Sequence, residues 1–210
     1  SKLTKFRKKY PNNFIDVGIA EEHALILANA MSLEGIVPFV SIYSTFLQRG
    51  YDEVVHDIAR MNSHVIIGID RCGIVGNDGE THQGIFDITF LLPVPNIIVC
   101  APRNSVEATN LINTAINVNR PFAIRYSKEK IDYEKTEIDE IPIGTWEQIN
   151  SGNDATLITY GDFVEESIPI IEKFKKEGIN VELVNARFLK PIDKKYFDKI
   201  LTKDKPIFIY

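Results

Sequence analysis

The stretch VPFVSIYSTFLQRGYDEVVHDIARMNSHVIIGID, residues 37–70, decides the fold class. It opens with an apolar run, residues 37–43, and closes with another, residues 64–69, and both runs are typical of buried strands. Between them, apolar residues recur at the spacing of one helix face: Leu47, Tyr51, Val54, Val55 and Ile58. A strand, a crossover helix and a second strand form a parallel pair.

The same alternation extends on both sides of this stretch. We expect further strands at residues 14–17, 97–101 and 122–126, and helices at residues 21–33 and 108–116. Residues 70–84 hold four glycines and are too irregular for a helix, so they read as a functional loop. The sequence therefore predicts an α/β domain over residues 1–127, built on a doubly wound, mostly parallel sheet.

A second, partial α/β domain is expected over residues 151–210. It is preceded by a charged linker, residues 128–150, because nine of the thirteen residues 128–140 are charged and cannot pack into a core. The final strand, residues 206–210, has no covering element after it. We interpret the chain as a fragment of a longer protein.

Composition excludes several classes of protein. Lys and Arg number 24 against 29 Asp and Glu, so the net charge of −5 does not favour nucleic acid or anionic membranes. No apolar run reaches the ~20 residues of a membrane span, and the basic N-terminus lacks the apolar core of a signal peptide. A cytoplasmic protein is expected. Its two cysteines, Cys72 and Cys100, are expected as thiols packed in a core.

Polar residues follow the predicted strands in three clusters, residues 16–23, 43–57 and 70–84, where α/β sheets bind ligands. Together they offer a carboxylate, an aromatic face, arginines and a histidine, which suit an organic anion or cofactor. The four histidines lack metal-ligand spacing, so no metal site is expected. Singly, each cluster has a plainer explanation: the glutamates favour a helix start, the aromatic ring joins the core, and the glycines make turns.

Five motifs resemble the 1-deoxy-D-xylulose-5-phosphate synthase family, and the resemblance covers nearly the whole chain. They are DVGIAEEHA at 16–24, IYSTFLQRGYD at 42–52, IDRCG at 69–73, DGETHQG at 78–84 and NARFLKP at 185–191. The resemblance implies a thiamine-diphosphate enzyme that joins pyruvate, with loss of CO2, to D-glyceraldehyde 3-phosphate. Its product would feed isoprenoid, thiamine and pyridoxal synthesis.

The resemblance also implies roles for single residues. Glu21 would hydrogen-bond the pyrimidine N1′ of the cofactor, with Glu22 as the alternative, and Phe46 would stack on that ring. The other implied contacts with the cofactor–substrate adduct are Tyr43, Arg49, Asp78 and His82.

The implied phosphate grip combines Arg71 with Lys128. Arginine suits a phosphate because its planar fork meets two oxygens. The family commonly carries Arg-Tyr-Pro-Arg where this chain has Arg125-Tyr126-Ser127-Lys128, so a lysine replaces the second arginine. Lys128 keeps the positive charge of that arginine, but without the planar fork it orients a bound phosphate less well.

The resemblance places Mg²⁺ and the diphosphate on an N-terminal domain that this chain lacks. We therefore expect an active homodimer for the full-length enzyme and no activity for the fragment alone. Two alternatives remain open, namely the small subunit of a split transketolase and a noncatalytic dimerisation module.

Overall fold

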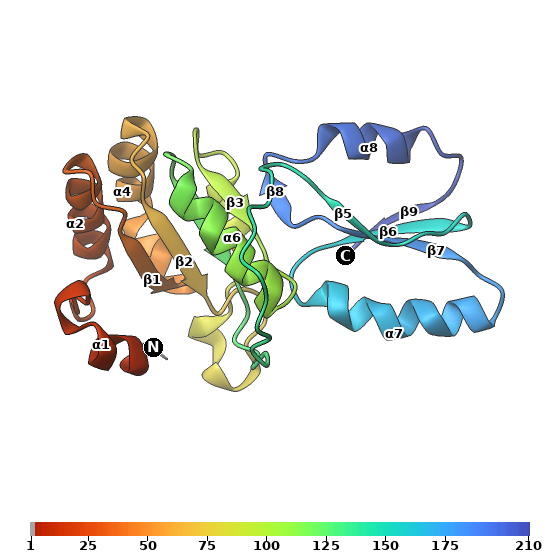
Figure 1. Ribbon diagram of the computed structural model, residues 1–210, viewed down its shortest axis with the longest axis horizontal. Helices are drawn as coiled ribbons and strands as arrows, with labels where there is room; N and C mark the ends of the chain where they lie inside the picture. The colour runs from red at the N-terminus through yellow and green to blue at the C-terminus, as the bar shows by residue number, and fades with distance from the viewer. Residues whose placement is uncertain (1–2) are drawn as a thin grey trace.

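The computed structural model describes residues 3–210 and contains two sheets side by side (Figure 1). The first sheet has strand order β1-β2-β4-β3-β8, and the second has order β5-β7-β6-β9. The first half of the chain holds these elements: α1 (Thr4–Lys9), η1 (Pro11–Asn13), α2 (Glu21–Leu33), β1 (Phe39–Tyr43), α3 (Ser44–Leu47), η2 (Gln48–Gly50), α4 (Tyr51–Glu53), η3 (Val54–Ala59), β2 (Ile66–Asp70), η4 (Gly76–Asp78), η5 (Glu80–His82), α5 (Asp87–Leu91), β3 (Ile98–Cys100), α6 (Ser105–Asn117) and β4 (Phe122–Arg125).

The first sheet is parallel in β1, β2, β4 and β3, with helices on both faces. On one face, α2, the helical run from α3 to η3, and α5 bury Leu25, Leu47 and Leu91 against the strands. On the other face, α6 buries Leu111 and Ala115. The doubly wound, mostly parallel α/β fold is thus confirmed. Both cysteines lie buried as free thiols, as expected.

The prediction of a strand at residues 14–17 is wrong, because this segment is an extended coil. No neighbouring strand pairs with it, since β1 bonds only to β2 within the described sheet. Its Ile15 is 58 % exposed, and the chain turns at Gly18, whose N–H donates to Asp16 Oδ1 over 3.1 Å. An apolar run becomes a strand only where a partner satisfies its backbone groups.

The helix expected after β1 is present but changes its winding. It runs from α3 through the 3₁₀ turn η2 and α4 into the π-helical η3. The apolar side chains that predicted it still face the sheet, and Leu47, Val54 and Ile58 are fully buried. The short helix α5 was not expected from the sequence.

The second half of the chain holds β5 (Glu147–Asn150), β6 (Ala155–Thr159), α7 (Phe163–Lys176), β7 (Val181–Asn185), β8 (Phe188–Lys190), α8 (Lys194–Leu201) and β9 (Ile207–Ile209). In the second sheet, β6 runs parallel to β7 and β9, while β5 is antiparallel to β7. Helices α7 and α8 lie on opposite faces of this sheet (Figure 1). The strand β5 lies within the last residues of the expected linker.

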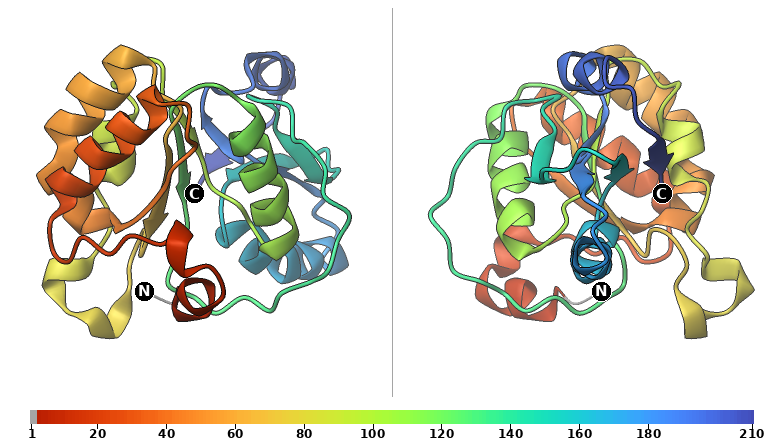
Figure 2. Two further views of the ribbon diagram at one scale, coloured as in Figure 1. Left: turned by 60° about the vertical axis from the view of Figure 1, so that its left-hand side comes forward. Right: turned by 90° about the vertical axis from the view of Figure 1, so that its right-hand side faces the viewer.

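Residues 128–140 have no regular structure and are largely exposed. They run beside α6, where the backbone N–H groups of Glu134 and Asp139 donate to Ser105 Oγ and Asn110 Oδ1, each over 3.1 Å (Figure 2). Further on, strand β8 returns to the first sheet and pairs antiparallel with its edge strand β3. The two sheets are therefore linked by the chain in both directions.

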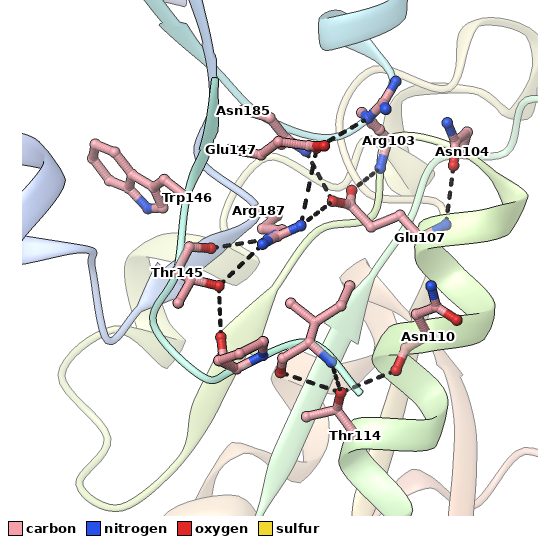
Figure 3. A network of polar contacts seen from close by, with 12 residues as sticks. Arg103, Asn104, Glu107, Asn110, Thr114, Thr145, Trp146, Glu147, Asn185 and Arg187 are labelled. Carbon is pink, nitrogen blue, oxygen red and sulfur yellow. Dashed lines mark hydrogen bonds and ion pairs between the residues drawn. The ribbon is translucent and has the colours of Figure 1, made fainter. Parts of the chain in front are cut away.

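A polar network joins the two sheets around Glu107 of α6, which is 5 % exposed (Figure 3). Its Oε1 accepts from Asn185 Nδ2 at 2.9 Å and from Arg187 Nη1 at 3.5 Å, and its Oε2 accepts from the Arg103 N–H at 2.8 Å. The same Arg187 donates through Nε to the carbonyl of Thr145 at 2.9 Å. Side chains from β7 and from the connection between β7 and β8 thus meet at the buried carboxylate of α6, and Arg187 extends the network to Thr145 before β5.

Candidate functional site

The carboxyl ends of the parallel strands collect the polar residues at one edge of the first sheet. β1 ends at Tyr43, the neighbouring β2 ends at Asp70, and β4 ends at Arg125. The loops that leave these ends carry the residues expected to bind a ligand, as open parallel sheets generally do.

Glu21 and Arg49 form the first part of the candidate site. Arg49 Nη1 donates to Glu21 Oε2 over 2.6 Å, and the glutamate side chain is 8 % exposed. The two helices can approach because of Gly50, where an added Cβ would lie 2.3 Å from Leu25 Cδ1. Glu21 also opens α2, where the helix dipole favours a negative charge. A carboxylate is thus held, largely buried, at the sheet edge.

An aromatic cluster forms the second part. Tyr43 and Phe46 stack with centroids 5.2 Å apart, and the His82 ring meets the Phe46 ring edge-on at 5.2 Å. Phe46 precedes Arg49 by three residues on the same helical run, so the aromatic cluster and the carboxylate lie within one turn of each other. The fold thus brings His82 to Tyr43 and Phe46, which lie more than 30 residues earlier in the sequence.

The third part is a charged cluster around Arg71. Its Nε donates to Asp78 Oδ2 and its Nη1 donates to Asp70 Oδ2, each over 2.8 Å, and Lys128 Nζ donates to Asp78 Oδ1. The guanidinium also lies 3.9 Å above the Tyr43 ring, which connects this cluster to the aromatic one. Two cations therefore share one carboxylate.

The charges of this cluster reinforce one another. The hydrogen bond from Lys128, followed by the one from Arg71, lowers the pKa of Asp78. Burial works against the Arg71 cation, but the bond to Asp78 and the charge of Asp70 outweigh it and raise the pKa of Arg71. Both shifts favour the charged forms of Asp78 and Arg71, so an anionic ligand could replace Asp78 as the partner of the Arg71 cation.

The structure thus brings Glu21, Tyr43, Phe46, His82, Arg71 and the other expected residues to one edge, with two contacts that the sequence did not predict. Arg49 donates to Glu21. Lys128 donates to Asp78, the same carboxylate that accepts from Arg71.

Two buried residues at this edge, Asp87 and Arg125, had no role expected from the sequence. They form an ion pair, with Arg125 Nε 2.8 Å from Asp87 Oδ2. The signal for it was present, because an arginine at the end of a central strand requires a buried counter-charge. Asp87 follows the glycine-rich loop and begins a helix too short for its periodicity to be seen.

Two clefts flank this edge. One of about 330 Å³ lies between the two sheets and includes Arg125, Lys128 and Tyr160 in its wall. A larger one of about 450 Å³ lies between α6 and residues 127–131 and holds none of the expected site residues. Its lining is mainly apolar, so the first cleft has the chemistry of an anion site and the larger one does not.

Comparison with known families identifies both halves of the chain. The family described as transketolase, pyrimidine binding domain, matches residues 1–133, and the one described as transketolase, C-terminal domain, matches residues 144–210. The chain belongs to the transketolase family.

Its curated relatives are more specific. The chain is 49 % identical over 99 % of its length to the 1-deoxy-D-xylulose-5-phosphate synthase of Bacillus velezensis, and 47 % identical to that of Bacillus cereus strain G9842. It spans 33 % of the length of each of these relatives.

Solved structures share the fold. A split-gene transketolase, solved as an inactive beta4 tetramer, superposes with a TM-score of 0.87 at 24 % identity, covering all of this chain and 69 % of that one. The transketolase of Campylobacter jejuni gives a TM-score of 0.80 at 22 % identity over 93 % of this chain and 32 % of that one. Within residues 3–210, no helix has the length and apolar character needed to cross a bilayer.

Proposed function

We propose that the chain works as part of a 1-deoxy-D-xylulose-5-phosphate synthase, a transferase that condenses pyruvate with D-glyceraldehyde 3-phosphate. The observation that carries this proposal is the grouping of Glu21, Phe46 and the cations Arg71 and Lys128 at one sheet edge. The 49 % identity to a synthase over 99 % of the chain supports the same assignment.

The donor set at this edge fits the pyrimidine half of thiamine diphosphate. Glu21 Oε2 is held by Arg49, and no donor within residues 3–210 occupies Oε1, which is left to accept a hydrogen bond from the N1′–H of the pyrimidine in its imino form. Phe46 offers a flat apolar face of the size of a pyrimidine. When bound, thiamine diphosphate supplies the carbon nucleophile that attacks the 2-oxo acid.

The remaining residues would then act on the substrates. His82, in contact with Phe46, can give or take a proton beside the cofactor ring. Arg71 offers a planar fork for the phosphate of the acceptor aldehyde, and Lys128 adds a point charge. Asp78, which bridges both cations, would be displaced or share them when the phosphate arrives.

We assign Mg²⁺ and the diphosphate contacts to a further domain of a longer, cytoplasmic, homodimeric protein. Within residues 3–210, no three carboxylates, histidines or cysteines are grouped as metal ligands. The 210-residue chain by itself is therefore expected to bind thiamine diphosphate weakly and to lack synthase activity, which titration calorimetry with and without Mg²⁺ can check.

A second candidate is the smaller subunit of a split transketolase. The TM-score of 0.87 to a split-gene transketolase favours it, while the higher identity to synthases favours the first proposal. The donor substrate separates the two: a synthase consumes pyruvate and releases CO2, whereas a transketolase takes its two-carbon unit from a ketose phosphate.

The proposal is tested by Glu21→Ala in the full protein that contains this chain. We expect loss of the exchange of the thiazolium C2 hydrogen of the bound cofactor, with the fold retained, because alanine is tolerated at a helix start. Glu22→Ala, the matched control one residue away, should leave the exchange unchanged. Wild-type exchange rates in Glu21→Ala would contradict the assignment.

A further inference from the structure

The three segments that carry the Arg71 cluster converge on one buried carboxylate, Asp87. This residue is 1 % exposed and is the first of α5. Its Oδ2 accepts from Arg125 Nε at 2.8 Å and lies 3.2 Å from Cys72 Sγ, while Arg125 Nη2 lies 3.4 Å from Oδ1. None of these three side chains belongs to the proposed site.

Cys72 fixes the point from which the Arg71 side chain departs. Arg71 has a φ of +61°, so the chain turns away from β2 at this residue. The Cys72 N–H directly after it donates to the Tyr126 carbonyl over 3.0 Å, and the thiol lies 3.2 Å from the Ile69 carbonyl. The turn is thus attached to the ends of both β2 and β4.

Arg125 fixes the segment that carries Lys128. It is the last residue of β4, 8 % exposed, and precedes Lys128 by three residues. Its guanidinium lies 5.4 Å from the centre of the Tyr160 ring, which follows β6 of the second sheet. Asp87 on one side and Tyr160 on the other therefore hold this end of β4.

The loop that carries Asp78 and His82 is closed at its base beside the same cluster. Gly73 and Gly84 exchange backbone hydrogen bonds of 2.7 and 2.8 Å. A Cβ at Gly84 would lie 2.2 Å from the Arg71 carbonyl, so the two segments are in direct contact there. Asp87 follows Gly84 by three residues, so its buried contacts with Cys72 and Arg125 hold the C-terminal end of this loop.

A buried ion pair at this place is not explained by stability alone. Apolar residues of similar volume often stabilise a core as well as a buried pair does. A guanidinium and a carboxylate add direction, because the fork fixes both distance and angle. Burial also raises the pKa of Cys72 well above its usual value, so the thiol stays neutral and can donate.

We propose that Asp87, Arg125 and Cys72 are positioning residues that set the separation of Arg71 and Lys128, and thereby the preference of the enzyme for a phosphorylated acceptor aldehyde. Cys72 and Arg125 line the cleft of about 330 Å³, but their side chains bond to Asp87 and to the Ile69 carbonyl, so we assign them the positioning of the cations and not contact with the substrate. The inference rests on the proposed function and adds to it the residues that determine acceptor specificity.

The test is Asp87→Asn in the full protein, assayed with D-glyceraldehyde 3-phosphate and with unphosphorylated D-glyceraldehyde. The ratio of the two kcat/KM values should fall about tenfold, through a higher KM for the phosphorylated aldehyde, while the KM for pyruvate stays within about twofold. Glu107→Gln is the matched control, because it alters an equally buried carboxylate paired with an arginine and should leave the ratio unchanged.

A parallel loss with both aldehydes, and hence a constant ratio, would overturn the inference. If Asp87→Asn does not fold, Cys72→Ala removes only the thiol contacts and should lower the ratio about threefold; no change would equally overturn it. If the wild type makes no synthase product, the proposed function fails instead. Binding of inorganic phosphate, followed by ³¹P NMR, then decides: it should be weakened in Asp87→Asn and not in Glu107→Gln.

Discussion

Glu107 and Glu182 are both buried carboxylates, 5 % and 0 % exposed, yet their pKa values move in opposite directions. Burial raises the pKa of Glu107, and the Arg103 N–H and the Arg187 charge only partly oppose it. Burial acts on Glu182 as well, but hydrogen bonds from Lys205, Lys203 and Thr156 outweigh it and lower its pKa to about 2.

The two pKa values shift in opposite directions because the cations approach the two carboxylates from different parts of the fold. Glu182 lies on β7, and both lysines reach it from the segment between α8 and β9, with contacts of 2.8 and 2.9 Å. Glu107 lies between the two sheets, and its arginine stands 3.5 Å away while also serving Thr145. A charge within one sheet is thus fully compensated, whereas the charge at the junction is not.

The largest effect on stability should come from Lys205→Met, which removes one of the two lysines that compensate the charge of Glu182. The lysine side chain is 5 % exposed and also donates to the Gly152 carbonyl at 2.7 Å. Its removal should lower the free energy of unfolding by about 4 kcal/mol, since Glu182 loses a buried partner. Urea unfolding at pH 7 measures this. Lys194→Met, at an exposed pair with Asp198, should change it by less than about 0.5 kcal/mol.

Lowering the pH should remove the stabilising contribution of the same carboxylate, Glu182, with a somewhat smaller loss in the free energy of unfolding. Since the folded pKa of Glu182 is about 2 and its ordinary value is 4.5, its contribution is present above pH 4.5 and is lost as the pH falls towards 2. The loss should reach roughly 3 kcal/mol. Urea titrations at several pH values should show a flatter acid limb for Glu182→Gln; an unchanged limb would contradict the compensation.

The smallest effect on stability is expected at Glu107, between the two sheets, and its dependence on pH should have the opposite sign to that of Glu182. A raised pKa means that the folded protein holds the Glu107 proton more tightly, so this contribution is present below pH 4.5 and is lost as the pH rises. The stability of the wild type relative to Glu107→Gln should therefore decline from pH 4 towards neutrality. A difference that grows with pH would show instead that Arg187 dominates.

Periodicity and residue order were enough to predict the parallel sheet, the helical run after β1 and the gathering of Tyr43, Phe46 and Arg71 at one edge. Glu21 reaches the same edge without the strand that was expected before it. These features depend on local spacing and on strand ends, which a sequence displays directly. The coil at residues 14–17 and the Arg49–Glu21 pair depend on neighbours distant in the chain. So does the Asp87–Arg125 pair, 38 residues apart, because an arginine at a strand end signals that a buried partner exists but not which residue it is.

The return of β8 to the first sheet has a consequence for the order of folding. Residues 188–190 complete an edge begun at residues 98–100, and Lys190 Nζ donates to the Leu92 carbonyl across the same edge, a contact that spans 98 residues. During synthesis, β3 therefore has one unpaired edge until residues 188–190 have been made. An unpaired edge strand can pair with other chains, so the edge of β3 is open to mispairing during this interval.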